Sequence, residues 1–302
     1  MNISLAIVRI WAVLVVVLGH YFVIGKVGVF QNEFIFDGHK GVLLFFGLSG
    51  YLFSKNYKII SSVRNFLKKR YIRLTVSGIP IFVVSYFVFL IQLKLEGFGT
   101  FTLEKLLLLF FSGITYTVAI FNKLIGPSNT GVMVFWSLTY EWIFYLSYAM
   151  CNKYLKKQYL LLLVLCLFDI DFSMFLVGVL IGNKRRLISI NIPKSISYVM
   201  LIIGTFTFIP LILTYFLYFL GLYSLSQENE LNNSLFFKNL SNSTYTVYLS
   251  HMIVFYALSY FLNNELNYFF VFLSLVVTFF VSYIWTHYIE SKYIYKLQKQ
   301  FL

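Results

Sequence analysis

Two polar residues interrupt an apolar stretch near the start of the chain. Arg9 and His20 lie eleven positions apart within residues 5–24. At about 100° per residue, this spacing puts both side chains on one helix face, about 16 Å apart along the axis. An arginine inside a membrane helix costs at least about 2.5 kcal/mol unless it is paired or solvated, so such residues usually mark a functional site. Arg9 alone could instead extend to the lipid headgroups, but the shared face favours a functional pair.

Three further polar residues in apolar surroundings are candidates for chemistry. Arg70 and Arg73 lie three positions apart in a basic run, where they either bind an anion or only follow the positive-inside rule. Glu141 lies in the aromatic-rich stretch FWSLTYEWIFYL. A carboxylate there is costly unless it faces a partner or water, so a functional role is favoured.

His251 and Glu290 are weaker candidates near the end of the chain. His251, in STYTVYLSHMIVFY, fits a core histidine hydrogen-bonded to a hydroxyl slightly better than a catalytic residue. Glu290 ends the last apolar stretch, where it could simply balance Lys292.

The composition indicates a polytopic membrane protein. Of the 302 residues, 60% are hydrophobic and 12% charged, whereas soluble domains have about 25% charged residues. The net charge of +13 does not predict a nucleic-acid partner, because the basic residues cluster between apolar segments and would meet anionic lipid. Cys151 and Cys166 lack metal-like spacing and are expected to be reduced. The N-terminus lacks the features of a cleavable signal peptide.

The elements that would position these residues form an all-α, polytopic transmembrane bundle of about ten spans. One integral-membrane domain over residues 1–302 is expected, without an additional soluble domain. A basic amphipathic segment at 58–73 is expected on the cytoplasmic surface. Apolar runs predict spans at 5–24, 41–57, 75–93, 103–121, 132–151, 159–182, 197–225, 244–261 and 268–287.

Two of these runs have alternative interpretations. The run at 159–182 is one pass or two short helices turning at Asp169 and Asp171, and the run at 197–225 is one tilted helix or two hinged at Pro210. One pass followed by two places the basic segment at 183–186 and the basic tail inside, so this combination is preferred. Small residues in the second span, Gly47, Ser49 and Gly50, predict a close helix approach.

Six blocks together carry a resemblance to a known family. In chain order they are RIWAVLVVVLGH, GVLLFFGLSGYLF, FLKKRYIRL, FWSLTYEWIFYL, NSTYTVYLSH and THYIESKYI. This ordered set, over residues 9–294, resembles the acyltransferase 3 family of multi-pass membrane acyltransferases that modify surface glycans and other acceptors. There are departures: an acid, an arginine, a glycine and a proline of the family pattern are replaced by Leu43, Lys69, Asn242 and Tyr293.

The resemblance implies transfer of an acyl group, most often acetyl, from acyl-CoA to a sugar hydroxyl. The implied catalytic residues are His20 as general base, Arg9 for an oxyanion or phosphate, and Glu141 as a candidate partner of His20. Arg70, Arg73 and Lys69 would bind the CoA phosphates. His251 and Glu290 are secondary candidates, and no metal is expected.

Other function classes remain open at this stage. A glycan-lipid flippase or other transporter, or a polysaccharide polymerase, would also be multi-pass, although no internal repeat typical of transporters is visible. The expected partners are membrane lipid and a glycan or lipid-linked sugar acceptor, not nucleic acid. The expected location is the inner (cytoplasmic) membrane, with both termini cytoplasmic. The sequence specifies neither the acceptor nor the oligomeric state.

Overall fold

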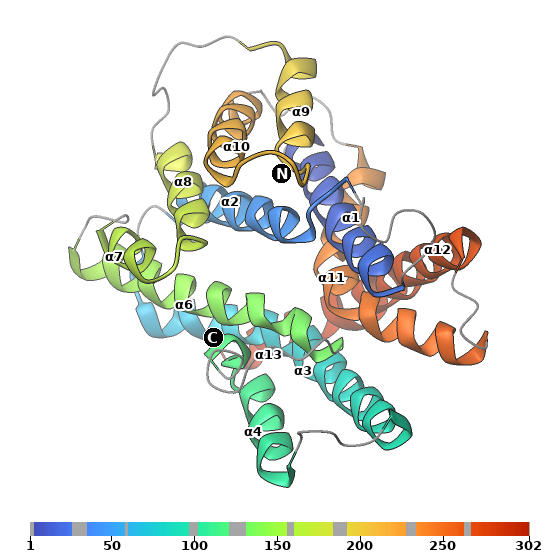
Figure 1. Ribbon diagram of the computed structural model, residues 1–302. Helices are drawn as coiled ribbons and strands as arrows, with labels where there is room; N and C mark the ends of the chain where they lie inside the picture. Colours follow the sequence, from blue (N-terminus) through green and yellow to red (C-terminus); the bar gives the residue numbers. More distant parts are fainter. Residues whose placement is uncertain are drawn as a thin grey trace. The chain divides into compact units, whose positions relative to one another are not determined.

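The computed structural model describes residues 3–25, 35–57, 60–96, 102–120, 131–155, 160–183, 192–227, 234–262 and 267–301. Within these ranges the chain is helical and contains no strand, only an isolated antiparallel bridge between Phe36 and Phe206 (Figure 1). The predicted all-α fold is therefore confirmed.

Three of the described helices are long and apolar enough to cross a membrane. They comprise Ile3–Phe22, Val63–Ile91 and Tyr268–Gln300. Several other helices are shorter, so the expected count of ten spans is not confirmed. The exposure pattern of the helix α12 (Tyr268–Ile284) also suits lipid. Its fully buried side chains include the small polar Ser274, Thr278 and Ser282, whereas its exposed ones include Phe269, Phe272 and Phe280.

The chain forms two compact units. Unit 1 comprises residues 1–66 and 146–244, and unit 2 comprises residues 67–145 and 245–302. The helices of unit 1 are α1 (Ile3–Gly25), α2 (Gly38–Asn56), α7 (Leu160–Phe168), α8 (Phe172–Asn183), α9 (Lys194–Ile203) and α10 (Leu211–Ser226). The π-helix η3 (Cys151–Leu155) also lies there.

Glycines let α2 pack against two neighbouring helices with almost no side chain between. A Cβ atom at Gly41 would lie 2.8 Å from the Ala12 carbonyl oxygen of α1. A Cβ at Gly50 would overlap the Phe175 carbonyl of α8, and one at Gly178 would overlap the Gly47 carbonyl of α2. The close approach predicted at Gly47 and Gly50 is confirmed, and α8 is the partner.

The two ambiguous runs are both broken. Over 197–225 the chain forms α9 and α10, as preferred from the sequence. Over 159–182 the expectation of one continuous pass is wrong, because α7 ends at Phe168 and α8 begins at Phe172. The Asp169 carboxylate accepts the backbone N–H of Asp171 at 3.1 Å. This local bond stabilises a turn in place of the next helical hydrogen bond.

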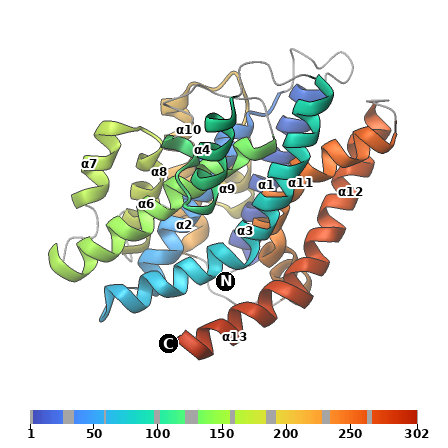
Figure 2. The same cartoon turned by 90° about the horizontal axis from the view of Figure 1, so that it is seen from below.

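The longest helix of unit 2 is α3. It combines two segments that were predicted from the sequence as separate elements. The basic run and the following apolar span form one helix of 34 residues, Val63–Glu96, with Pro80 inside it. The other elements are α4 (Leu103–Ile114), the 3₁₀ helix η2 (Gly131–Phe135), α6 (Trp136–Met150), α11 (Leu235–Phe261), α12, the π-helix η4 (Trp285–Glu290) and α13 (Ser291–Phe301). The ends of α3, α6 and α11 extend into unit 1. Figure 2 shows α12 and α13 as consecutive parts of the C-terminal helix, which changes direction where they join.

Candidate functional site

The basic part of α3 presents two arginines with different exposure. Arg70 is buried, at 8% exposure, whereas Arg73 is exposed. Their spacing of three residues places them on neighbouring positions of one helix face. Lys69, beside them in the sequence, is also exposed. This part of α3 therefore offers accessible cations at the end of a membrane helix.

On α6, Glu141 has a partner one helical turn further along. The Tyr145 hydroxyl donates a hydrogen bond to Glu141 Oε1. Tyr145 is buried and Glu141 is half-buried. A carboxylate in these surroundings needs such a donor, because unpaired charge is costly away from water.

A second carboxylate, Glu290, is held by residues of α11 and η4. Glu290 Oε2 accepts hydrogen bonds from Thr246 Oγ1 at 3.0 Å and Thr286 Oγ1 at 3.3 Å. The two hydroxyl oxygens are themselves 2.9 Å apart. Glu290 does more than balance Lys292, since it is the buried acceptor of this network.

These three parts converge on Arg73. Its guanidinium interacts electrostatically with Glu141, Tyr145, Tyr245 and Glu290. Tyr145 also interacts electrostatically with Arg70. The formal charges of Arg70, Arg73, Glu141 and Glu290, which we call the Arg73 cluster, sum to zero. The charge of nearby carboxylates biases the orientation of an exposed cation, which stays able to meet a ligand.

The family comparison covers α3, α6 and α11 and ends within η4, before Glu290. The acyltransferase-domain profile of the acyltransferase 3 family matches residues 2–287. The chain belongs to the acyltransferase 3 family. It is also 27% identical over 182 residues to the "O-acetyl transferase" of Shigella phage Sf6, which covers 59% of this chain and 53% of the phage protein. The chain thus spans about half the length of that curated relative. No solved structure matches it.

Membership of the acyltransferase 3 family confirms the resemblance read from the six sequence blocks. Four of the residues singled out there lie in unit 2 and come together: Arg70, Arg73, Glu141 and Glu290. Thr246 and Thr286 could not be identified from the sequence, because hydroxyl residues are common in membrane helices.

A further candidate in unit 2, His251, is fully buried on α11. Its Nδ1 lies 2.6 Å from the Tyr248 carbonyl oxygen of the same helix. Because a carbonyl only accepts, Nδ1 carries the proton, and a neutral ring then has Nε2 as its basic nitrogen. One partner of His251 is thus a backbone carbonyl, and a hydroxyl partner stays a prediction.

Arg9 and His20 lie in unit 1, on the continuous helix α1, and both are half-buried. The helix preserves the shared face predicted from their spacing. A partnership of His20 with Glu141 stays a prediction, since the two residues belong to different units.

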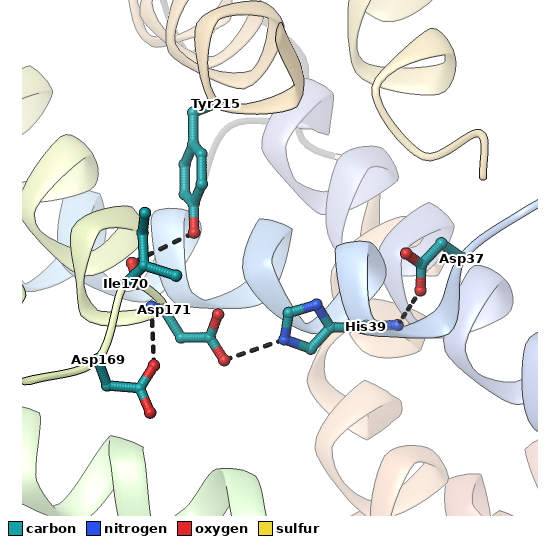
Figure 3. Close-up of polar contacts among 6 residues, drawn as sticks. All are labelled: Asp37, His39, Asp169, Ile170, Asp171 and Tyr215. Atoms are coloured by element: carbon teal, nitrogen blue, oxygen red, sulfur yellow. Dashed lines mark hydrogen bonds and ion pairs between the residues drawn. The ribbon is translucent and has the colours of Figure 1, made fainter. Parts of the chain in front are cut away.

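Unit 1 of this acyltransferase 3 family member also contains a histidine–carboxylate pair that sequence reasoning missed. His39 Nε2 lies 3.0 Å from Asp171 Oδ2 (Figure 3). Asp37 caps α2 by accepting the His39 backbone N–H at 2.9 Å, and the Tyr215 hydroxyl donates to the Ile170 carbonyl at 3.2 Å. The pair therefore fastens the start of α2 to the turn between α7 and α8. The acids inside an apolar run were the only feature of the sequence that could have indicated this pair. The partner of Asp171 could not be predicted, because His39 is 132 residues away in the chain.

Proposed function

We propose that the protein is a membrane-bound O-acyltransferase that transfers an acetyl group from acetyl-CoA to a hydroxyl of a cell-surface or lipid-linked polysaccharide. The observation that carries this proposal is the family match over nearly the whole chain, together with a relative named as an O-acetyl transferase. The Arg73 cluster supports it, because it combines accessible cations with carboxylates, and of these residues Arg70, Arg73 and Glu141 lie inside the matched region.

Arg73, Arg70 and Lys69 bind the CoA phosphates in this proposal. Phosphate oxygens accept charge-assisted hydrogen bonds, and the planar guanidinium matches them with two parallel donors. Without a ligand, the formal charges of the two arginines are balanced by those of Glu141 and Glu290. The CoA phosphates add negative charge when they bind, and the positive charge of the exposed Lys69 offsets part of it. This end of α3 faces the cytoplasm, where acetyl-CoA is made, and both termini lie on the same side.

His20 accepts the proton of the acceptor hydroxyl. The hydroxyl oxygen attacks the thioester carbonyl carbon, the carbon–sulfur bond breaks, and CoA leaves as the thiolate, which then takes up a proton. Arg9 stabilises negative charge on the same helix face. His20 lies about 22 Å along α1 from Leu5, so a donor whose phosphates stay at the membrane surface must extend its pantetheine arm inward to reach it.

The decisive experiment measures acetyl transfer from acetyl-CoA by the purified full-length protein in lipid nanodiscs. His20→Ala should lower kcat at least about 100-fold, because a positioned general base contributes about 10²–10⁴ in rate. Unchanged activity would remove His20 from the mechanism. Absence of any CoA binding would favour the transporter class, and trapping of an acyl-enzyme would replace threading by a covalent relay.

The acceptor class is tested in cells. The acetyl content of surface glycans, measured by NMR with and without the gene, should fall when the protein is absent. Restoration by the wild-type chain but not by His20→Ala would connect the change to catalysis.

A further inference from the structure

We propose that the π-helix η4 positions Arg73 for the acyl donor, through a Glu290 carboxylate that Thr246 and Thr286 hold in place. The three are positioning residues, since none of them needs to touch the donor. This inference rests on the proposed function, because it takes the donor phosphates to bind at Arg73.

The first support is the completeness of the hydroxyl–carboxylate network. Thr246, Thr286 and Glu290 are 2%, 7% and 7% exposed. Both threonine hydroxyls donate to one carboxylate oxygen, Glu290 Oε2, from two different elements. A buried carboxylate with two fixed donors has a defined position.

The second support is that the neighbours of both threonines are hydrogen-bonded to α3 beside Arg73. Tyr245 on α11 donates its hydroxyl to the Leu74 carbonyl at 3.4 Å, one residue beyond Arg73. Trp285 of η4 donates Nε1–H to Ser77 Oγ at 3.2 Å, one turn further along. The elements that carry Thr246 and Thr286 are thus fixed to the segment of α3 that carries Arg73.

The third support is the π-helical geometry itself. A π-turn inserts one residue into an α-helix, which rotates all later side chains by about 100°. η4 contains both Thr286 and Glu290 and separates α12 from α13. The inserted residue therefore changes the direction in which Glu290 points relative to the buried face of α12, which carries Ser274, Thr278 and Ser282. π-Turns are costly and are frequent at functional sites.

The physical consequence is preorganisation of a long, flexible cation. A free arginine loses side-chain entropy when it binds phosphate, whereas one already oriented by a fixed carboxylate loses less. Loss of either hydroxyl should therefore weaken donor binding more than it slows chemistry.

The test compares paired substitutions in the full-length protein in nanodiscs, with the Kd for acetyl-CoA measured by titration calorimetry. Thr246→Val and Thr286→Val should each raise Kd about tenfold, or 1.4 kcal/mol, the size of one hydrogen bond to a charged group. Thr246→Ser and Thr286→Ser, which keep the hydroxyl, should bind within about twofold of wild type. In the Arg73→Ala background the valine substitutions should have no further effect, because the group they position is gone.

The outcomes separate the two proposals. If Arg73→Ala leaves Kd unchanged, the donor site itself is misplaced. If Arg73→Ala weakens binding but both valine variants bind normally, or serine and valine variants behave alike, the positioning role alone is refuted. Full additivity of Thr246→Val with Arg73→Ala also refutes it. Melting temperatures identify any variant that is only unfolded, and the second threonine then provides the comparison.

Discussion

The ion pair of His39 with Asp171 should stabilise unit 1 by an amount that its exposure sets. The His39 side chain is 43% exposed and that of Asp171 is 11% exposed, with 3.0 Å between Nε2 and Oδ2. Exposed pairs contribute about 0.2–1 kcal/mol and hydrogen bonds to charged groups about 1.5–3 kcal/mol. With one partner nearly half in solvent, we expect His39→Gln to cost about 1 kcal/mol at pH 5.5.

The sign of the pH dependence follows from the pKa of His39, which precedes the second predicted span. The hydrogen bond to Asp171 raises this pKa, burial lowers it, and the charges of Asp171, Asp37 and Asp169 raise it further, with a net increase. A histidine with a higher pKa in the folded state binds its proton more tightly there. The stabilisation is therefore complete below the unfolded pKa of about 6.5 and is lost as pH rises through the folded pKa.

The assay is a double-mutant cycle on melting temperature in detergent, with wild type, His39→Gln, Asp171→Asn and the double variant at pH 5.5 and pH 9. At pH 5.5 the single variants should each melt about 2 °C lower, and the double variant no lower than either. At pH 9 the coupling should shrink to that of a neutral hydrogen bond. Equal coupling at both pH values, or additive single effects, would refute the reasoning.

Three further substitutions test other contacts. Gly178→Ala should lower the melting temperature by several degrees, because its Cβ overlaps the Gly47 carbonyl, while Gly38→Ala, whose Cβ has ordinary contacts at 3.6 Å, should change it by less than about 1 °C. Lys40→Met should cost about 2–3 kcal/mol in thermal or denaturant unfolding, because Lys40 is buried and its ammonium donates to two carbonyls at 2.6 Å. Tyr145→Phe should lower acyl transfer about tenfold and the melting temperature by about 2–4 °C, because the half-buried Glu141 carboxylate loses its hydroxyl donor.

The sequence predicted what depends on composition and on isolated residues. Apolar runs predicted the helices, Gly47 and Gly50 predicted a close contact, and Glu141 was identified because a carboxylate is rare in an apolar helix. Pairings and hydrogen-bond register were not predictable. The break at Asp169 depends on whether the Asp171 backbone N–H donates to the Asp169 carboxylate or to a helical carbonyl. The π-turn in η4 changes the backbone hydrogen-bond pattern, and no particular amino-acid composition marks it.

Distance along the chain hid the remaining contacts. Thr246 and Thr286 are 40 residues apart, and His39 and Asp171 are 132 residues apart. Neither pair carries a local spacing signal, because each depends on how separate helices pack. The polar residues were visible individually, and the structure supplied the partners.

The short helices α7 and α8 have a consequence for the surrounding lipid. With 9 and 12 residues, they are about 14 and 18 Å long, whereas the hydrocarbon core of a bilayer is about 30 Å thick. A bilayer that meets these helices must become thinner beside them or admit water to the turn at Asp169 and Asp171. The hydrophobic mismatch at this turn is therefore expected to grow with lipid chain length. It should destabilise the His39–Asp171 pair most in the thickest membranes.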